Sequence, residues 1–137
     1  MIVIIAELLS IVAINLTTAV THQLPLAQCL EVQHQYGKAL LVAIPAVCFI
    51  APIAEETVFR GFLFGWMRKI MPLWSAAVTS GLIFSLLHFQ PQLLVPLWIV
   101  GIILAYVYHY SRSLIPGMLT HGIFNLIGII MILKTTC

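Results

Sequence analysis

The most constraining feature of this 137-residue sequence is its long stretches without charge. Residues 70–111 contain no Asp, Glu, Lys or Arg, and neither do residues 113–133. An α-helix rises about 1.5 Å per residue, so about 20 apolar residues cross the hydrocarbon core of a bilayer. The first stretch is therefore long enough for two membrane spans, and the second is long enough for one.

The composition points to the same lipid environment. Only 7% of the residues are charged and 62% are hydrophobic, whereas roughly 25% of the residues in soluble domains are charged. A soluble domain could not cover its surface with so few charges. This excludes a cytosolic globular domain, and a net charge of +2 spread this thinly excludes a nucleic-acid-binding face. We therefore expect a protein whose partner is the lipid bilayer and which has no nucleic-acid partner.

Polar interruptions divide the chain into five predicted membrane helices. The tripeptide Gln90-Pro91-Gln92 separates the third helix from the fourth as a tight turn. Pro45 and Pro52 lie inside the second helix, which we expect to be kinked or broken. The expected fold is all-α, a polytopic membrane bundle of about five transmembrane helices. The predicted spans are residues 1–20, 39–67, 71–89, 93–110 and 114–133.

The cationic residues give a weak indication of orientation. Arg68, Lys69 and Arg112 fall on one predicted side of the membrane, and Lys38 and Lys134 fall on the other. Because cytoplasmic loops carry an excess of Lys and Arg, this distribution weakly favours an N-terminus in the cytoplasm.

Polar side chains on three of the predicted helices fall at one depth. Glu55, His88 and Asn125 each lie thirteen or fourteen residues from the side that carries the three cations, which corresponds to roughly 20 Å. His121 lies one helical turn shallower. Ionisable groups inside a membrane are costly and mark functional sites by default, so we expect these residues to meet in one layer.

The spacing of the two glutamates predicts different roles for them. Glu56 and Arg60 are four residues apart, so they can pair and cancel their charges inside lipid. Glu55 points about 100° away from its neighbour and lacks that local partner. Glu55 is therefore the candidate general base, with His88 as the group that shares its water.

His121 and Asn125 are also four residues apart and can face the same cavity. An imidazole and a carboxamide there could donate hydrogen bonds to a developing oxyanion. This pattern favours hydrolysis of a peptide bond, in which Glu55 and His88 activate a water and the other two residues stabilise the tetrahedral oxygen. Alternatively, His121 and Asn125 could form interhelical hydrogen bonds with a purely structural role.

Three segments carry a resemblance to a known family. Residues 55–61, Glu-Glu-Thr-Val-Phe-Arg-Gly, resemble the EExxxR(G) motif of the CAAX prenyl protease and bacteriocin-processing (CPBP, or Abi) family of intramembrane endopeptidases. Residues 84–88, Phe-Ser-Leu-Leu-His, match the second motif of that family, FxxxH. Residues 121–125, His-Gly-Ile-Phe-Asn, match the third motif, HxxxN. The motifs occur in the family's order and span about half of the chain.

The resemblance implies an intramembrane glutamic endopeptidase similar to the type II CAAX prenyl proteases. Its substrate would be a peptide or protein with a C-terminal or membrane-adjacent cleavage site, such as a prenylated or bacteriocin-type peptide. Relatives usually carry further N-terminal helices, so we expect this chain to be a shortened version. The residues that the motifs assign to the site are Glu55, His88, His121 and Asn125 as catalytic residues, with Glu56 and Arg60 in support.

The resemblance also divides the chain into two parts. Residues 1–37 are expected to form an N-terminal transmembrane helix with a polar loop, and residues 38–137 a CPBP-like peptidase core. We expect an integral multi-pass protein of the plasma membrane, with a thylakoid or other organellar membrane as the alternative location.

Three other functions stay open from the sequence. The same fold could serve a catalytically silent membrane scaffold or a bacteriocin self-immunity protein. We expect no cofactor, but a zinc-dependent protease could use Glu55, His88 and His121 as metal ligands, although no HExxH pair is present. A proton or solute transporter is the weakest alternative, because no internal repeat is found.

Overall fold

The structure is a computed structural model, and it describes residues 40–134. Every element in this part of the chain is a helix, and no strand occurs within it. The all-α prediction is therefore confirmed. The predicted span 1–20 and the polar loop after it lie outside the described residues.

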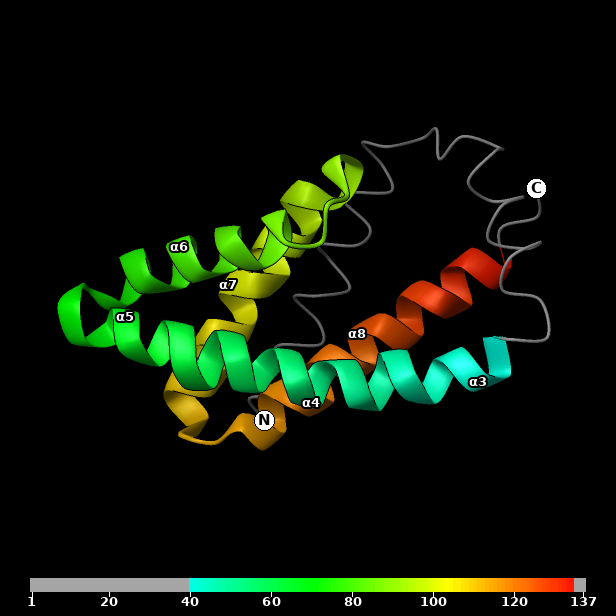
Figure 1. Ribbon diagram of the computed structural model, residues 1–137, viewed down its shortest axis with the longest axis horizontal. Coiled ribbons are helices and arrows are strands. Elements are labelled where there is room, and N and C mark those ends of the chain that lie inside the picture. Colours follow the sequence, from blue (N-terminus) through cyan, green and yellow to red (C-terminus); the bar gives the residue numbers. More distant parts are fainter. Residues whose placement is uncertain (1–39, 135–137) are drawn as a thin grey trace.

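The first part of the described chain is one uninterrupted helical rod (Figure 1). Its register changes along the way, because two segments of it are π-helical. The segments are α3 (Leu40–Pro45), η1 (Ala46–Ile50), α4 (Ala51–Glu56), η2 (Thr57–Phe64) and α5 (Gly65–Ile70). The helix was expected to be kinked or broken, and the second of these outcomes, a break, does not occur. The chain stays helical through both prolines, although Pro52, the second residue of α4, has no N–H to donate to the preceding turn of the rod.

Three further helices complete the described part (Figure 1). Helix α6 (Leu73–Leu86) returns beside the rod, and a short 3₁₀ turn, η3 (Pro91–Leu93), leads into α7 (Leu94–Ser111). Helix α7 packs against α6, and α8 (Leu114–Lys134) packs against α7, η1 and α4. Arg112 adopts a left-handed conformation (φ 55°) that ends α7 and turns the chain into α8.

The third predicted span ends earlier than the sequence suggested. Helix α6 stops at Leu86, so His88 lies in the turn after the helix rather than within it. The cause is local: Phe89 has a positive φ of 52°, and Gln90 is extended because a residue before proline is pushed out of the helical region.

Helices α6 and α7 approach each other very closely at two glycines. A Cβ atom added to Gly101 would lie 2.6 Å from the Cα atom of Gly81, so both positions need glycine. Trp98 stabilises the same crossing, because its Nε1 donates a hydrogen bond to the carbonyl oxygen of Val78 at 2.9 Å. This close approach determines which part of the α7 backbone faces the rod.

Among the described residues of this protein, two charged side chains are fully buried, whereas many large apolar side chains are exposed. The largest fully buried side chains include Arg60 and Glu56, whereas Phe62 is 76% exposed. Within the described part of the chain, two segments are long and apolar enough to cross a membrane, Pro91–Ser111 and Leu114–Met131, and Leu73–Leu86 is a shorter apolar helix. Charged groups inside and large apolar groups outside indicate a protein whose solvent is lipid.

Candidate active site

A buried ion pair lies at the centre of the bundle. Arg60 Nη1 donates to Glu56 Oε1 at 2.8 Å, and these residues are 1% and 0% exposed. The pairing predicted from their spacing is therefore confirmed. Arg60 Nη2 also donates to the carbonyl oxygen of Gly101 at 3.2 Å, at the glycine crossing between α6 and α7. The glycine crossing therefore helps to hold the guanidinium in place.

The same glutamate joins the rod to α8. His121 Nδ1 lies 3.0 Å from Glu56 Oε1, which also faces the Arg60 guanidinium. A carboxylate paired with arginine accepts hydrogen bonds, so this contact assigns the Nδ1 proton to His121. Gly117, one turn earlier on α8, makes room for the carboxylate, because a Cβ there would lie 3.0 Å from Glu56 Oε2. Glu56 therefore orients the His121 ring as well as neutralising Arg60.

The His88 ring is oriented by a hydrogen bond to a main-chain carbonyl group of α6. Its Nδ1 lies 2.8 Å from the carbonyl oxygen of Phe84, four residues earlier. A carbonyl oxygen can only accept, so Nδ1 carries the proton in this contact. In the neutral ring the other nitrogen, Nε2, then presents a lone pair towards the site.

Glu55 lies between these two histidines. Its Oε2 is 3.8 Å from His88 Nε2 and 3.6 Å from His121 Nε2. Both distances exceed a direct hydrogen bond but fall within the reach of one shared water. Glu55 Oε2 is buried and has no hydrogen-bond partner among the described residues. Three of the four residues that were expected to meet, Glu55, His88 and His121, therefore lie together.

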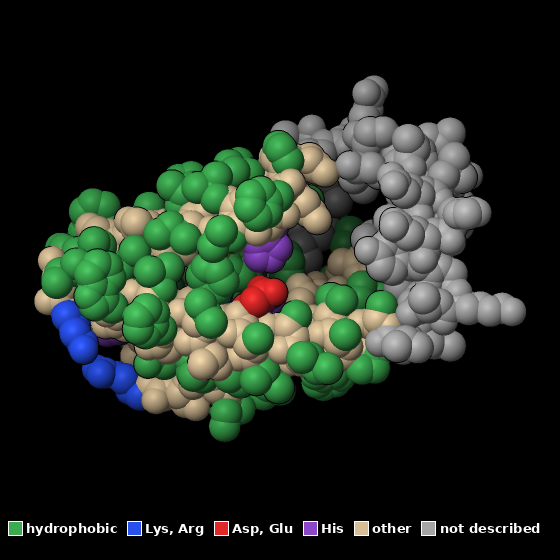
Figure 2. Space-filling view, in the orientation of Figure 1, with side chains coloured by type: hydrophobic (Ala, Val, Ile, Leu, Met, Phe, Trp, Pro, Cys, Tyr) green, Lys and Arg blue, Asp and Glu red, His purple; other side chains and the backbone are tan. Residues whose placement is uncertain are grey.

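Part of the site is exposed at the surface of the described residues. The side chains of Glu55 and His88 are 30% and 28% exposed. Figure 2 shows a carboxylate beside a histidine on a face that is otherwise largely hydrophobic. His121, by contrast, is almost fully buried behind them.

Asn125 makes a different contact from the one that its depth suggested. Its Nδ2 donates to the carbonyl oxygen of Val47 at 2.8 Å. In a regular α-helix this carbonyl would accept from Ala51, but the N–H of Ala51 bonds to Ala46 in the π-helical register. A π-type partner would be Pro52, which has no N–H. The register change and Pro52 together leave the Val47 carbonyl without a backbone donor, and the Asn125 side chain supplies the hydrogen bond instead.

One residue at the centre of the site was given no role by the sequence reasoning. Phe84 is fully buried, and the Arg60 guanidinium lies 4.5 Å from the centre of its ring. The same ring makes edge contacts with His88 and His121, at centroid distances of 4.6 and 5.6 Å. The sequence signals for Phe84 were its place as the first residue of the FxxxH motif and its spacing four residues before His88, where an i, i+4 pair on a helix can meet.

The polar side chains of the site do not have a metal-binding arrangement among the described residues. Among residues 40–134, no group of three His, Cys, Asp or Glu side chains is arranged to hold a metal ion. The polar atoms that face one another belong to Glu55, His88 and His121, the three residues named above as alternative zinc ligands.

Comparison with known proteins gives one match. The model of a protein family described as Type II CAAX prenyl endopeptidase Rce1-like matches residues 37–127, about two thirds of the chain. The matched residues include the whole polar layer. No curated protein and no solved structure matches the chain.

Proposed function

The chain belongs to the Rce1-like family of type II CAAX prenyl endopeptidases, and from this premise we propose that it is an intramembrane endopeptidase that hydrolyses a peptide bond with an activated water. One observation carries the proposal. Glu55 Oε2 is buried, has no hydrogen-bond partner among the residues that the structure describes, and faces the Nε2 atoms of two histidines. Both rings have their Nδ1 atoms engaged elsewhere, so their Nε2 atoms are directed at the same small volume.

In the proposed mechanism, Glu55 and His88 share a water. The water donates one hydrogen bond to Glu55 Oε2 and the other to His88 Nε2, across the 3.8 Å between these atoms. Glu55 takes a proton as the water oxygen forms a bond to the substrate's carbonyl carbon. The carbon–nitrogen bond then breaks, and Glu55 returns the proton to the leaving amine.

We propose that His121 and Asn125 stabilise the oxyanion. His121 can donate from Nε2 only as an imidazolium, because its Nδ1 proton faces Glu56. The carboxylates of Glu55 and Glu56 lie 3.6 and 3.0 Å from the two ring nitrogens of His121. Asn125 uses one Nδ2 hydrogen on Val47, and the second hydrogen of the amide would serve the oxyanion. Glu56 and Arg60 would position these groups and would not touch the substrate.

The proposed substrate is a peptide or protein with a C-terminal or membrane-adjacent cleavage site, prenylated or of the bacteriocin type. We propose a multi-pass location in the plasma membrane, or in an organellar membrane. The partial exposure of Glu55 and His88 supports access by a segment that lies in or on the bilayer.

The decisive experiment replaces the proposed base. Purified full-length protein in liposomes would be given a prenylated CAAX reporter peptide, as wild type and as Glu55→Gln. The amide keeps the shape of the side chain but cannot take the proton, so cleavage should fall about 10²–10⁴-fold. Glu31→Gln is the matched control, because it makes the same substitution outside the motifs and should cleave at the wild-type rate.

A purified Glu55→Gln protein that cleaves at the wild-type rate would refute this mechanism. The same pair of variants would be compared in cells by proteomic analysis of membrane-protein N- and C-termini, which identifies natural substrates. A biological effect that survives in Glu55→Gln, with normal membrane abundance, would instead identify a scaffold or immunity protein.

Zinc dependence is tested separately. We expect a chelator such as 1,10-phenanthroline to leave wild-type cleavage unchanged. A wild type that is silenced by the chelator and restored by zinc would assign the chemistry to a metal held by Glu55, His88 and His121.

A further inference from the structure

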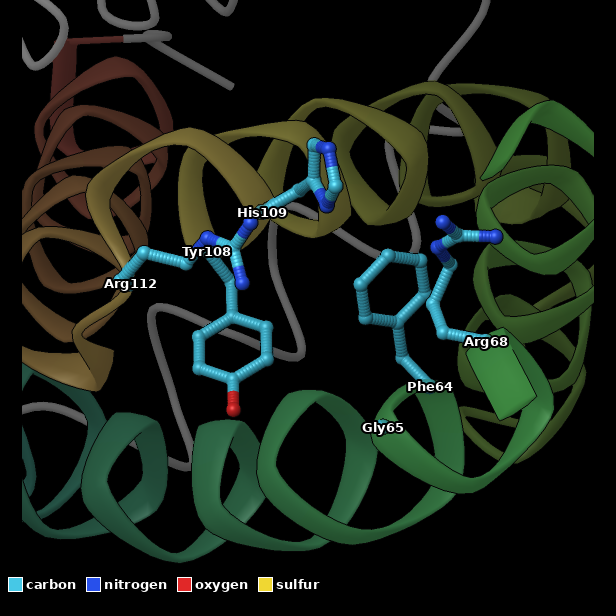
Figure 3. A pocket seen from close by; sticks show the side chains of 6 residues that line it. All are labelled: Phe64, Gly65, Arg68, Tyr108, His109 and Arg112. Carbon is cyan, nitrogen blue, oxygen red and sulfur yellow. The ribbon is translucent and has the colours of Figure 1, made fainter. Parts of the chain in front are cut away.

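A second polar cavity lies away from the glutamate site, at one end of the bundle. Its volume is about 250 Å³, and it opens between α5 and the last turn of α7 (Figure 3). Figure 2 shows Lys and Arg side chains gathered at one end of the molecule. The cavity is lined by Phe64, Gly65, Arg68, Tyr108, His109 and Arg112.

The lining of this cavity is cationic, and none of its lining residues is acidic. Arg68 is half-buried, and its Nη1 donates to the carbonyl oxygen of Met71 at 2.8 Å. That bond fixes the guanidinium, and among residues 40–134 its charge has no acidic partner at this end. The two carboxylates of the described chain, Glu55 and Glu56, belong to the catalytic layer several turns away. The cavity is therefore suited to an anionic group.

Exposed aromatic residues place this cavity at the depth of lipid headgroups. Trp66, Trp74 and Tyr110 are all exposed, and each lies within two turns of the chain reversals at this end. Exposed Trp and Tyr side chains concentrate where a bilayer meets water. A cationic cavity at this level meets phosphate groups of lipids before any other anion.

We propose that this cavity binds the headgroup phosphate of an anionic phospholipid. Two arginines can hold phosphate oxygens through paired N–H groups, and the Tyr108 hydroxyl and the His109 ring can add hydrogen bonds. The volume accommodates a headgroup but not acyl chains, which would stay in the bilayer beside the exposed aromatic residues. Basic pockets between membrane helices are known to bind anionic headgroups.

The test uses the full-length protein in nanodiscs. The wild type and its variants would be placed in discs of phosphatidylcholine with a minor fraction of phosphatidylglycerol. After detergent extraction, the lipid that copurifies with each protein would be measured by native mass spectrometry. Arg68→Gln/Arg112→Asn should retain the anionic lipid about 30-fold less well, because each cation near an anionic surface contributes about fivefold. Asn is chosen at position 112 because it tolerates the left-handed backbone found there.

Lys69→Gln is the matched control. It removes a neighbouring exposed cation that does not line the cavity, so retention should change less than twofold. An equal loss in this control would overturn the proposal, since it would make the effect one of net charge. Equal retention by wild type and the double variant would overturn it as well.

Two further measurements keep the proposal testable. Arg112→Asn alone leaves the Arg68 hydrogen bond intact, so a loss of retention in this variant cannot come from unfolding around Met71. Inorganic phosphate added at millimolar concentration should not displace the copurifying lipid. Displacement by phosphate would instead show that the cavity takes the free anion from solution.

Discussion

The buried pair of Glu56 and Arg60 allows a prediction whose size can be worked out from the structure. Arg60→Met removes the guanidinium and fills most of its volume. Glu56 would then be left fully buried without its cationic partner, with the His121 Nδ1 proton as the remaining partner of Oε1. Removing one member of a buried ion pair costs about 3–5 kcal/mol. The lost bond to the Gly101 carbonyl adds about 1 kcal/mol.

The free energy of unfolding should therefore fall by roughly 4–6 kcal/mol. For a chain of this length such a loss lowers the melting temperature by roughly 10 °C or more. The assay is thermal unfolding in detergent, followed by tryptophan fluorescence, together with the amount of protein in the membrane fraction. Lys69→Met is the matched control, because it removes an exposed cation and should change stability by less than about 0.5 kcal/mol.

The double variant Glu56→Gln/Arg60→Met separates charge from packing. It removes both charges, and the Gln side-chain oxygen can still accept from His121, so most of the lost stability should return. Wild-type stability in Arg60→Met alone would show that the pair does not hold the bundle together. A double variant as unstable as the single one would show that the cost lies in packing rather than in an unpaired charge.

Three further changes test the packing and the site. Gly101→Ala should lower stability sharply, since its Cβ would lie 2.6 Å from Gly81 Cα; Gly128→Ala, with nothing within 4 Å, should be neutral or up to about 1 kcal/mol more stable in the same thermal assay. Asn125→Ala should cost about 1 kcal/mol through the carbonyl bond it loses and lower kcat roughly 10²–10³-fold if it also holds the oxyanion, so normal kcat with reduced stability would make its role structural. Phe84→Leu should destabilise the fold by about 1–2 kcal/mol through the lost ring contacts. It should lower cleavage less than Glu55→Gln, because the backbone carbonyl that orients His88 remains; an equal loss of cleavage would contradict this.

Part of the site could be predicted because it depends on one helix alone. Glu56 and Arg60 lie four residues apart, and the helical repeat brings such side chains together wherever the helix packs. The charge-free stretches likewise predicted the helices of the second half of the chain to within a few residues, because lipid demands apolar helices of a minimum length. The shared depth of Glu55 and His88 also followed from counting residues.

Other features depended on how the backbone register and the turns came out. His88 reaches Glu55 from a turn, and its orientation is set by the Phe84 carbonyl, which helical counting did not foresee. The contact of Asn125 exists because a π-helical segment and Pro52 leave the Val47 carbonyl without a backbone donor. The two prolines suggested a kinked or broken helix, and only the register showed how the helix continues through them.

The sequence by itself determined the lipid environment, the all-helical class and the pairing of Glu56 with Arg60, since each follows from composition or from neighbours within one helix. Only the tertiary structure decided that His121 faces both glutamates across 65 residues of chain, and that Phe84 packs against Arg60 and both histidines. Those contacts require α6, α7 and α8 to pack at particular positions. The glycine crossing of α6 and α7 fixes one of these positions, and side-chain spacing along a single helix carries no information about it.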